Sequence, residues 1–137
     1  MSQDDAQRLI DAVNHQELMR RRQVHGRDLN DWHTALRELK AAGETRQALV
    51  LLHEIIDKTL ALAQYDAREP QLWWFTQAAW LHERHRDYDK AAAVLQQWLD
   101  AWPDRRAIPW RSRPAIDRER TKVHARIQRL RRRAGVL

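Results

Sequence analysis

Apolar residues recur every three or four positions along most of the chain, a spacing that places them on one face of an α-helix. This pattern predicts helices over residues 4–22, 30–42, 45–65, 70–86, 89–102 and 115–134. The first of them carries Ala6, Leu9, Ile10 and Val13 on one face. Runs in which apolar and polar residues alternate, as they do in strands, are missing. We therefore expect an all-α fold.

Residues that start, stop or turn helices stand between these segments. Asn30 is suited to cap the second helix, and Gly43 to end it in the left-handed conformation. Pro70 fits the first turn of the fourth helix, and Pro103 stops the fifth. The segment His25-Gly26-Arg27-Asp28 is typical of a turn.

Composition agrees with a helical protein of a reducing compartment. The chain has three glycines, four prolines and no cysteine, which excludes disulfides and thiolate metal sites. The first residues are polar, and no apolar run approaches the ~20 residues of a membrane span. We expect a soluble, cytoplasmic protein that does not bind a membrane.

Charge is distributed unevenly along the chain. The net charge is +6, yet residues 103–137 hold 12 of the 25 Lys and Arg residues and only 3 of the 19 Asp and Glu residues. The basic character is thus confined to the last quarter, and the remainder is slightly acidic. Such asymmetry favours a basic helix or tail that meets an acidic surface.

One segment has the residue spacing of a known repeat. The cluster Asp87-Tyr88-Asp89-Lys90-Ala91 is followed by Leu95, Trp98 and Pro103. These intervals resemble the second half of a tetratricopeptide repeat, although that family prefers a small residue where Trp98 stands. The first half would comprise Phe75, Ala78, Ala79 and His82. A second copy lies 43 residues earlier, against 34 in the family, and carries Trp32, Ala35, Leu36, Leu39, Ala48, Leu52 and Ile55.

The resemblance implies an α-solenoid fragment, made of antiparallel helix hairpins that stack on one another. We expect a single domain over residues 1–137, with an N-terminal helix over 1–27 and two hairpins over 28–103. A basic linker over 104–114 and a basic C-terminal helix over 115–137 complete it. In this stack Trp32 packs against Ala48 in the first hairpin, and Phe75 against Ala91 in the second.

The resemblance also implies a partner-binding groove on the first helix of each hairpin, and hence an adaptor that binds a protein or an acidic peptide. Carried over position by position, the groove comprises Asn30, His33, Arg37, Lys40, Trp73, Thr76, Trp80, Glu83 and Arg84. It would offer cations for carboxylates beside large aromatic surfaces. The alternative is that Trp73 and Trp80 belong to the core, or that the first or last helix covers the groove.

The basic C-terminal helix is a second candidate, this time for nucleic acid. Its cations could neutralise several phosphates; they are Arg118, Arg120, Lys122, Arg126, Arg129, Arg131, Arg132 and Arg133. The alternative is that Val123, Ile127 and Leu130 of this helix cap the last hairpin. We favour this alternative, and it is compatible with a role in binding nucleic acid. A third possibility is self-association into a homodimer through exposed Trp.

Catalysis has no visible machinery in the sequence. His82 and His85 stand three positions apart, whereas the zinc-protease motif requires four, and a third ligand is not evident. No nucleophile elbow or phosphate-binding loop is present. We expect a protein that is not an enzyme and that has no cofactor or metal.

Overall fold

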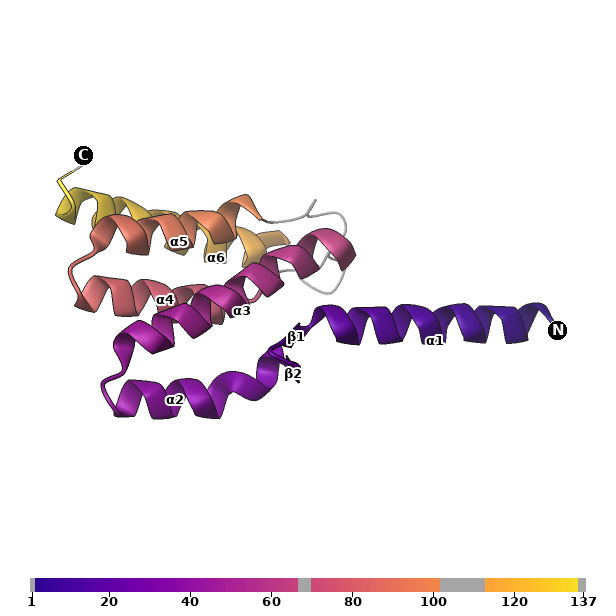
Figure 1. Ribbon diagram of the computed structural model, residues 1–137. Helices are drawn as coiled ribbons and strands as arrows, with labels where there is room; N and C mark the ends of the chain where they lie inside the picture. Colours follow the sequence, from indigo (N-terminus) through magenta and orange to yellow (C-terminus); the bar gives the residue numbers. More distant parts are fainter. Residues whose placement is uncertain (1, 67–69, 102–112, 136–137) are drawn as a thin grey trace.

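A computed structural model describes residues 2–66, 70–101 and 113–135 of the chain (Figure 1). The all-α prediction is confirmed over these residues, with one minute two-stranded sheet added. The elements are α1 (Gln3–Arg21), β1 (Gln23–Val24), β2 (Arg27–Asp28), η1 (Leu29–Trp32), α2 (His33–Ala41), α3 (Thr45–Asp66), α4 (Leu72–Arg84), α5 (Tyr88–Asp100) and α6 (Arg113–Arg133).

The helices α2 to α5 form two antiparallel hairpins that pack side by side. The hairpin of α2 and α3 contacts the hairpin of α4 and α5 through α3 and α4, and α6 packs on α5 (Figure 1). Successive helices are therefore neighbours in space. This arrangement is the stack of helix hairpins expected from the sequence.

The core lies between these helices. Ala48, Phe75 and Ala91 are completely buried, as the predicted hairpin contacts require, whereas Trp32 is only half-buried against the core. Trp98 is also fully buried, and its Nε1 donates a hydrogen bond of 2.9 Å to the carbonyl oxygen of Pro70. The bulky residue at position 98 thus has both an apolar site and a partner for its polar atom.

The predicted turn at residues 25–28 belongs to a β-hairpin that the sequence pattern missed. His25 and Gly26 have positive φ angles of 51° and 77°, as the two central residues of a tight type I′ turn do. The strands are only two residues long, with Gln23 opposite Asp28. A run this short shows no alternation that could predict it.

The second helix begins later than expected. Asn30 does not cap it; the Asp28 side chain instead accepts a hydrogen bond of 3.1 Å from the Asn30 amide and caps η1. The cap lies upstream because Asp28 is also held by Arg22, with Nε and Oδ1 2.9 Å apart. Gly43 has the predicted left-handed φ of 74°.

The other helices begin close to the positions predicted from the sequence. The fourth helix starts at Leu72, two residues after Pro70, and α6 starts at Arg113, two residues before the expected position. Trp102, Pro103 and most of the expected basic linker lie outside the described residues.

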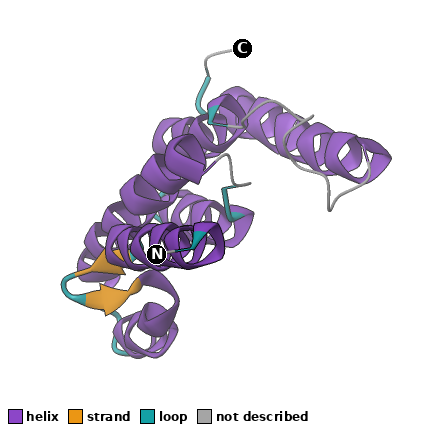
Figure 2. Cartoon of the chain, turned by 90° about the vertical axis from the view of Figure 1, so that its right-hand side faces the viewer, coloured by secondary structure: helices purple, strands orange, loops and turns teal. Residues whose placement is uncertain are grey.

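The helix α1 is the element that departs from the rest of the fold. It projects away from the stacked hairpins (Figure 1), and Figure 2 views the molecule from the side towards which α1 projects. Its contacts with the body are at its C-terminal end, where Leu18 packs against the core and the Arg21 guanidinium lies 4.1 Å from the centre of the Tyr65 ring. The predicted apolar face of α1 is therefore not buried by any other element of the described residues.

The helix α6 closes the other end of the stack. Ile116, Val123, Ile127 and Leu130 are all buried, and the last three belong to the main core. On its flank, Arg120 donates a hydrogen bond of 3.2 Å to the Leu99 carbonyl oxygen near the end of α5. The apolar stripe of α6 thus caps the second hairpin, as favoured from the sequence.

Candidate interaction surface

The structure brings together residues of α2 and α4 that were predicted to line the groove. The His33 ring lies 4.6 Å from the Trp73 ring, measured between centroids. About two turns further along α2, Lys40 donates a hydrogen bond of 2.7 Å to Oε1 of Gln77, and its ammonium lies 5.0 Å from the centre of the Trp80 ring. We call the exposed surface formed here by α2 and α4 the α2–α4 face.

The two tryptophans of this face are on the surface. Trp73 is 44% exposed to solvent and Trp80 is 40% exposed, whereas the adjacent Trp74 is buried. The interpretation that Trp73 and Trp80 are core residues is therefore wrong. Helix geometry explains the division, because Trp73 and Trp80 are seven positions apart and share one side of α4, while Trp74 is turned by about 100°.

Two cations lie against the exposed ring of Trp80. The Arg84 guanidinium lies 4.8 Å from the centre of the Trp80 ring, which it shares with Lys40. A cation held over an aromatic face is attracted by the ring quadrupole yet keeps hydrogen-bond donors for a ligand. The face therefore combines apolar area with positive charge.

The remaining predicted groove residues differ in their placement. Asn30 and Arg37 are exposed. Thr76 uses its hydroxyl to donate a hydrogen bond of 2.9 Å to the Trp73 carbonyl oxygen of its own helix. Glu83 does not line the face; it points to α6, because two arginines of that helix neutralise it.

The contacts of Glu83 place α6 beside α4. Arg126 and Arg133 reach the two carboxylate oxygens of Glu83 at 3.3 and 3.4 Å, and Arg133 also lies 4.7 Å from the centre of the Tyr88 ring. Arg131 is half-buried. The other cations predicted to bind nucleic acid are exposed and make no ion pair within the described residues: Arg118, Lys122, Arg129 and Arg132.

A histidine pair joins α3 to α4. The Nε2 atoms of His53 and His82 lie 3.0 Å apart, and the Nδ1 of His82 is buried without a hydrogen-bond partner. Burial lowers the pKa of both rings, and for His82 the neighbouring His53 lowers it further. Among the described residues, no three His, Cys, Asp or Glu side chains lie together as a metal site requires.

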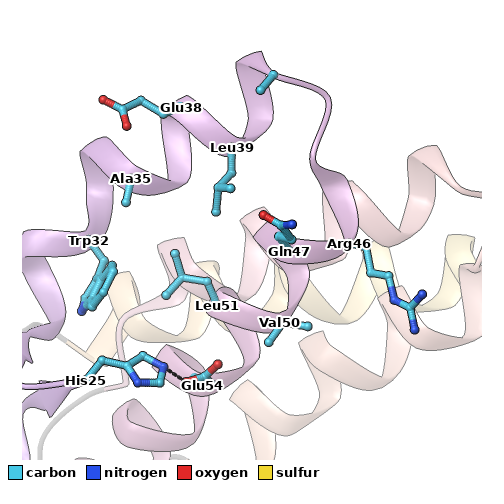
Figure 3. Close-up of a pocket in the computed structure, with 11 residues that line it drawn as sticks. His25, Trp32, Ala35, Glu38, Leu39, Arg46, Gln47, Val50, Leu51 and Glu54 are labelled. Carbon is cyan, nitrogen blue, oxygen red and sulfur yellow. Dashed lines mark ion pairs between the residues drawn. The ribbon is translucent and has the colours of Figure 1, made fainter.

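A second surface, which the sequence did not indicate, lies on the opposite flank of α2. It is a hollow of about 680 Å³ between α2 and α3, and we call it the α2–α3 groove (Figure 3). An ion pair between His25 and Glu54 lies at one end. The groove is lined by His25, Trp32, Ala35, Glu38, Leu39, Ala42, Arg46, Gln47, Val50, Leu51 and Glu54.

This groove was missed because most of its apolar residues fit the core stripe of a helix equally well. Trp32, Ala35 and Leu39 were all assigned to the interior, yet each is only half-buried, and each also lines a flank that no described element covers. Val50 could have indicated the groove, since a large aliphatic residue outside the apolar stripe of α3 indicates a second apolar surface.

No family model, curated protein or solved structure matches the chain. None of the described helices combines the length and the apolar composition that crossing a bilayer requires.

Proposed function

We propose that the chain is a non-enzymatic adaptor whose α2–α4 face binds an acidic segment of a partner protein. The observation that supports this proposal is the pair of half-exposed tryptophans, Trp73 and Trp80, in contact with His33, Lys40 and Arg84. Large exposed aromatic side chains are costly in water and are enriched at the centres of protein interfaces.

The chemistry of the face defines the partner. Arg37 and Arg84 offer forked guanidinium donors, which match the geometry of a carboxylate, and Lys40 adds a point charge between the helices. An apolar side chain of the same segment would displace water from the exposed edges of Trp73 and Trp80. A peptide with several Asp or Glu residues and one bulky apolar anchor satisfies both requirements.

A displayed library of random peptides, selected on the immobilised full-length chain, tests this proposal. We expect the enriched peptides to contain acidic residues next to an aromatic or large aliphatic residue. Their affinity should fall at least about tenfold, the equivalent of one hot-spot contact, in the Trp80→Ala variant. It should fall similarly in the double variant Arg37→Glu/Arg84→Glu.

The matched control is the double variant Arg8→Glu/Arg132→Glu, which makes the same change in net charge at exposed positions away from the face. Its affinity should remain that of the unmodified chain. Enrichment of peptides without acidic residues would contradict the proposal, and so would equal losses in the two double variants, since binding would then follow net charge alone.

A second candidate, binding of nucleic acid by α6, is favoured by the exposed cations Arg118, Lys122 and Arg129. They stand four and seven positions apart and so lie on one side of the helix. A labelled single-stranded oligonucleotide should then bind with an association constant whose logarithm falls with the logarithm of the salt concentration. The expected slope is about −2, because about 0.7 counterions are released for each phosphate that the three cations neutralise. An affinity unchanged by Lys122→Glu/Arg129→Glu would remove α6 from consideration.

A further inference from the structure

Two apolar surfaces of this chain have no partner among the described residues. One is the α2–α3 groove. The other is the side of α1 that carries Ala6, Leu9, Ile10 and Val13, which we call the α1 apolar face. One surface is a hollow and the other is a convex helix, so they are complementary in shape as well as in polarity.

The three large residues of the α1 apolar face are exposed. Leu9, Ile10 and Val13 are 58%, 52% and 56% exposed to solvent. A single helix of 19 residues is only marginally stable in water, and an amphipathic helix gains most of its stability from covering its apolar side. An isolated projecting helix with this face is therefore a helix that lacks a partner.

The α2–α3 groove has the matching character. Ala35 and Leu39 line it from α2, and Val50 and Leu51 line it from α3 (Figure 3). Ala42, the residue that follows α2, also lines it. Val50 is 56% exposed to solvent. The small alanines allow another helix to approach α2 closely, and the larger aliphatic residues provide apolar area for it to bury.

The α1 helix of the same chain does not reach this groove. From the β-hairpin, α1 extends in one direction and α2 in the opposite direction (Figure 1). The junction is held by the Arg22–Asp28 ion pair and by a hydrogen bond of 3.0 Å from Nε1 of Trp32 to the Val24 carbonyl oxygen. Folding α1 back would remove Leu18 from the core and the Arg21 guanidinium from the Tyr65 ring.

We propose that a second copy of the chain fills the groove, in a two-fold symmetric dimer in which each α1 lies along the α2–α3 groove of the other copy. The opposite directions of α1 and α2 produce this arrangement, because a two-fold axis beside the β-hairpin places α1 of each chain along α2 of its partner. The lengths agree: Ala6 to Val13 spans about 10 Å of helix, and the nine residues of α2 span about 14 Å.

Burial of both surfaces at once favours this dimer over a simple pairing of two α1 helices. An α1–α1 pair would leave both grooves open, and it would draw Glu17 and Arg20 into its seam, since they continue the apolar face towards the body. The reciprocal arrangement covers two grooves and two helices. Counted on all four surfaces, it buries on the order of 1,000 Å², the area at which specific interfaces begin.

Molecular mass in solution is the first test. Light scattering on the eluting full-length chain should give twice the chain mass of 16.4 kDa. Val13→Glu and Val50→Glu should each convert the protein to monomer, although one lies on α1 and the other in the groove. Because both positions are exposed, the body should keep its helical circular dichroism. His15→Glu, on the opposite side of α1, is the control and should remain dimeric.

Cross-linking is the second test, and the absence of cysteine from the chain makes it specific. Chains with Val13→Cys and chains with Val50→Cys are mixed and treated with a short bis-maleimide. We expect a product of twice the chain mass that forms in the mixture and not with either chain alone. A product from Val13→Cys alone would indicate α1–α1 pairing, and it would overturn the proposal.

Two further outcomes would also overturn it. One is an intramolecular product from a chain that carries both cysteines, at high dilution and at high concentration alike. The other is an unmodified chain that remains at 16.4 kDa at every concentration tested. The α2–α4 face lies on the other flank of α2 and stays open in the dimer, so this inference and the proposed function can fail independently.

Discussion

His53 of α3 and His82 of α4 meet with their Nε2 atoms 3.0 Å apart, in the layer that joins the two hairpins. One ring must donate and the other must accept, so at least one of them has to be neutral. His82 is almost fully buried and His53 is half-buried, and burial lowers the pKa of both below the ordinary value of 6.5. Their protonation is thus linked to folding.

The free energy of unfolding should consequently decrease as the pH falls below 6.5. In the unfolded chain both histidines take up a proton near that pH, whereas in the folded chain they stay neutral to a lower pH. Because the unfolded state then binds more protons, acid favours it. Lys90 acts in the same direction on both rings, while Asp57 and Asp87 oppose it in part.

Urea denaturation at a series of pH values from about 7.5 to about 5 measures this dependence. The double variant His53→Gln/His82→Gln should be less stable at pH 7.5 but should lose less stability on acidification. The exposed His15→Gln is the control and should keep the slope of the unmodified chain. Parallel curves for the double variant and the unmodified chain would show that this pair does not carry the dependence.

Trp98 and Trp80 should respond very differently to the same substitution. Trp98→Phe removes the Nε1 donor to Pro70 and opens a cavity in the core, so we expect a loss of about 1–3 kcal/mol in the free energy of unfolding. Trp80→Phe, at an exposed position, should change it by less than about 0.5 kcal/mol. Urea denaturation of the two variants tests this, and similar losses in both would mean that the exposed ring of Trp80 is structural.

The helices and the core could be predicted because their signals are local. Ala48, Phe75 and Ala91 are buried as expected, since a regular apolar spacing assigns such residues to one face of a helix. Periodicity does not reveal where the covering surface is, however. The face of α1 around Leu9 has the same spacing as a core helix, yet nothing within the described chain covers it.

The candidate site was predicted in part for the same reason. Lys40 and Trp80 meet because neighbouring hairpins align α2 with α4, which the resemblance to tetratricopeptide repeats implied; that resemblance itself remains a prediction. Glu83 was misplaced because its direction depends on Arg126 and Arg133, which follow more than 40 residues later. Such distant pairing has no local signature in a sequence.

Hydrogen exchange should reveal whether α1 is covered. In the Val50→Glu variant, which we expect to be monomeric, the amides of residues 6–13 should be protected less than about tenfold, because an isolated helix opens at a cost of about 1 kcal/mol or less. In the unmodified chain their protection should rise with protein concentration, since association by mass action stabilises α1. The amides of α3 and α5 provide the internal control and should be strongly protected in both proteins at every concentration. The decisive concentration is one at which the unmodified chain has twice the mass of a monomer. If residues 6–13 are then equally and weakly protected in the two proteins, the dimer forms elsewhere and α1 projects into solvent.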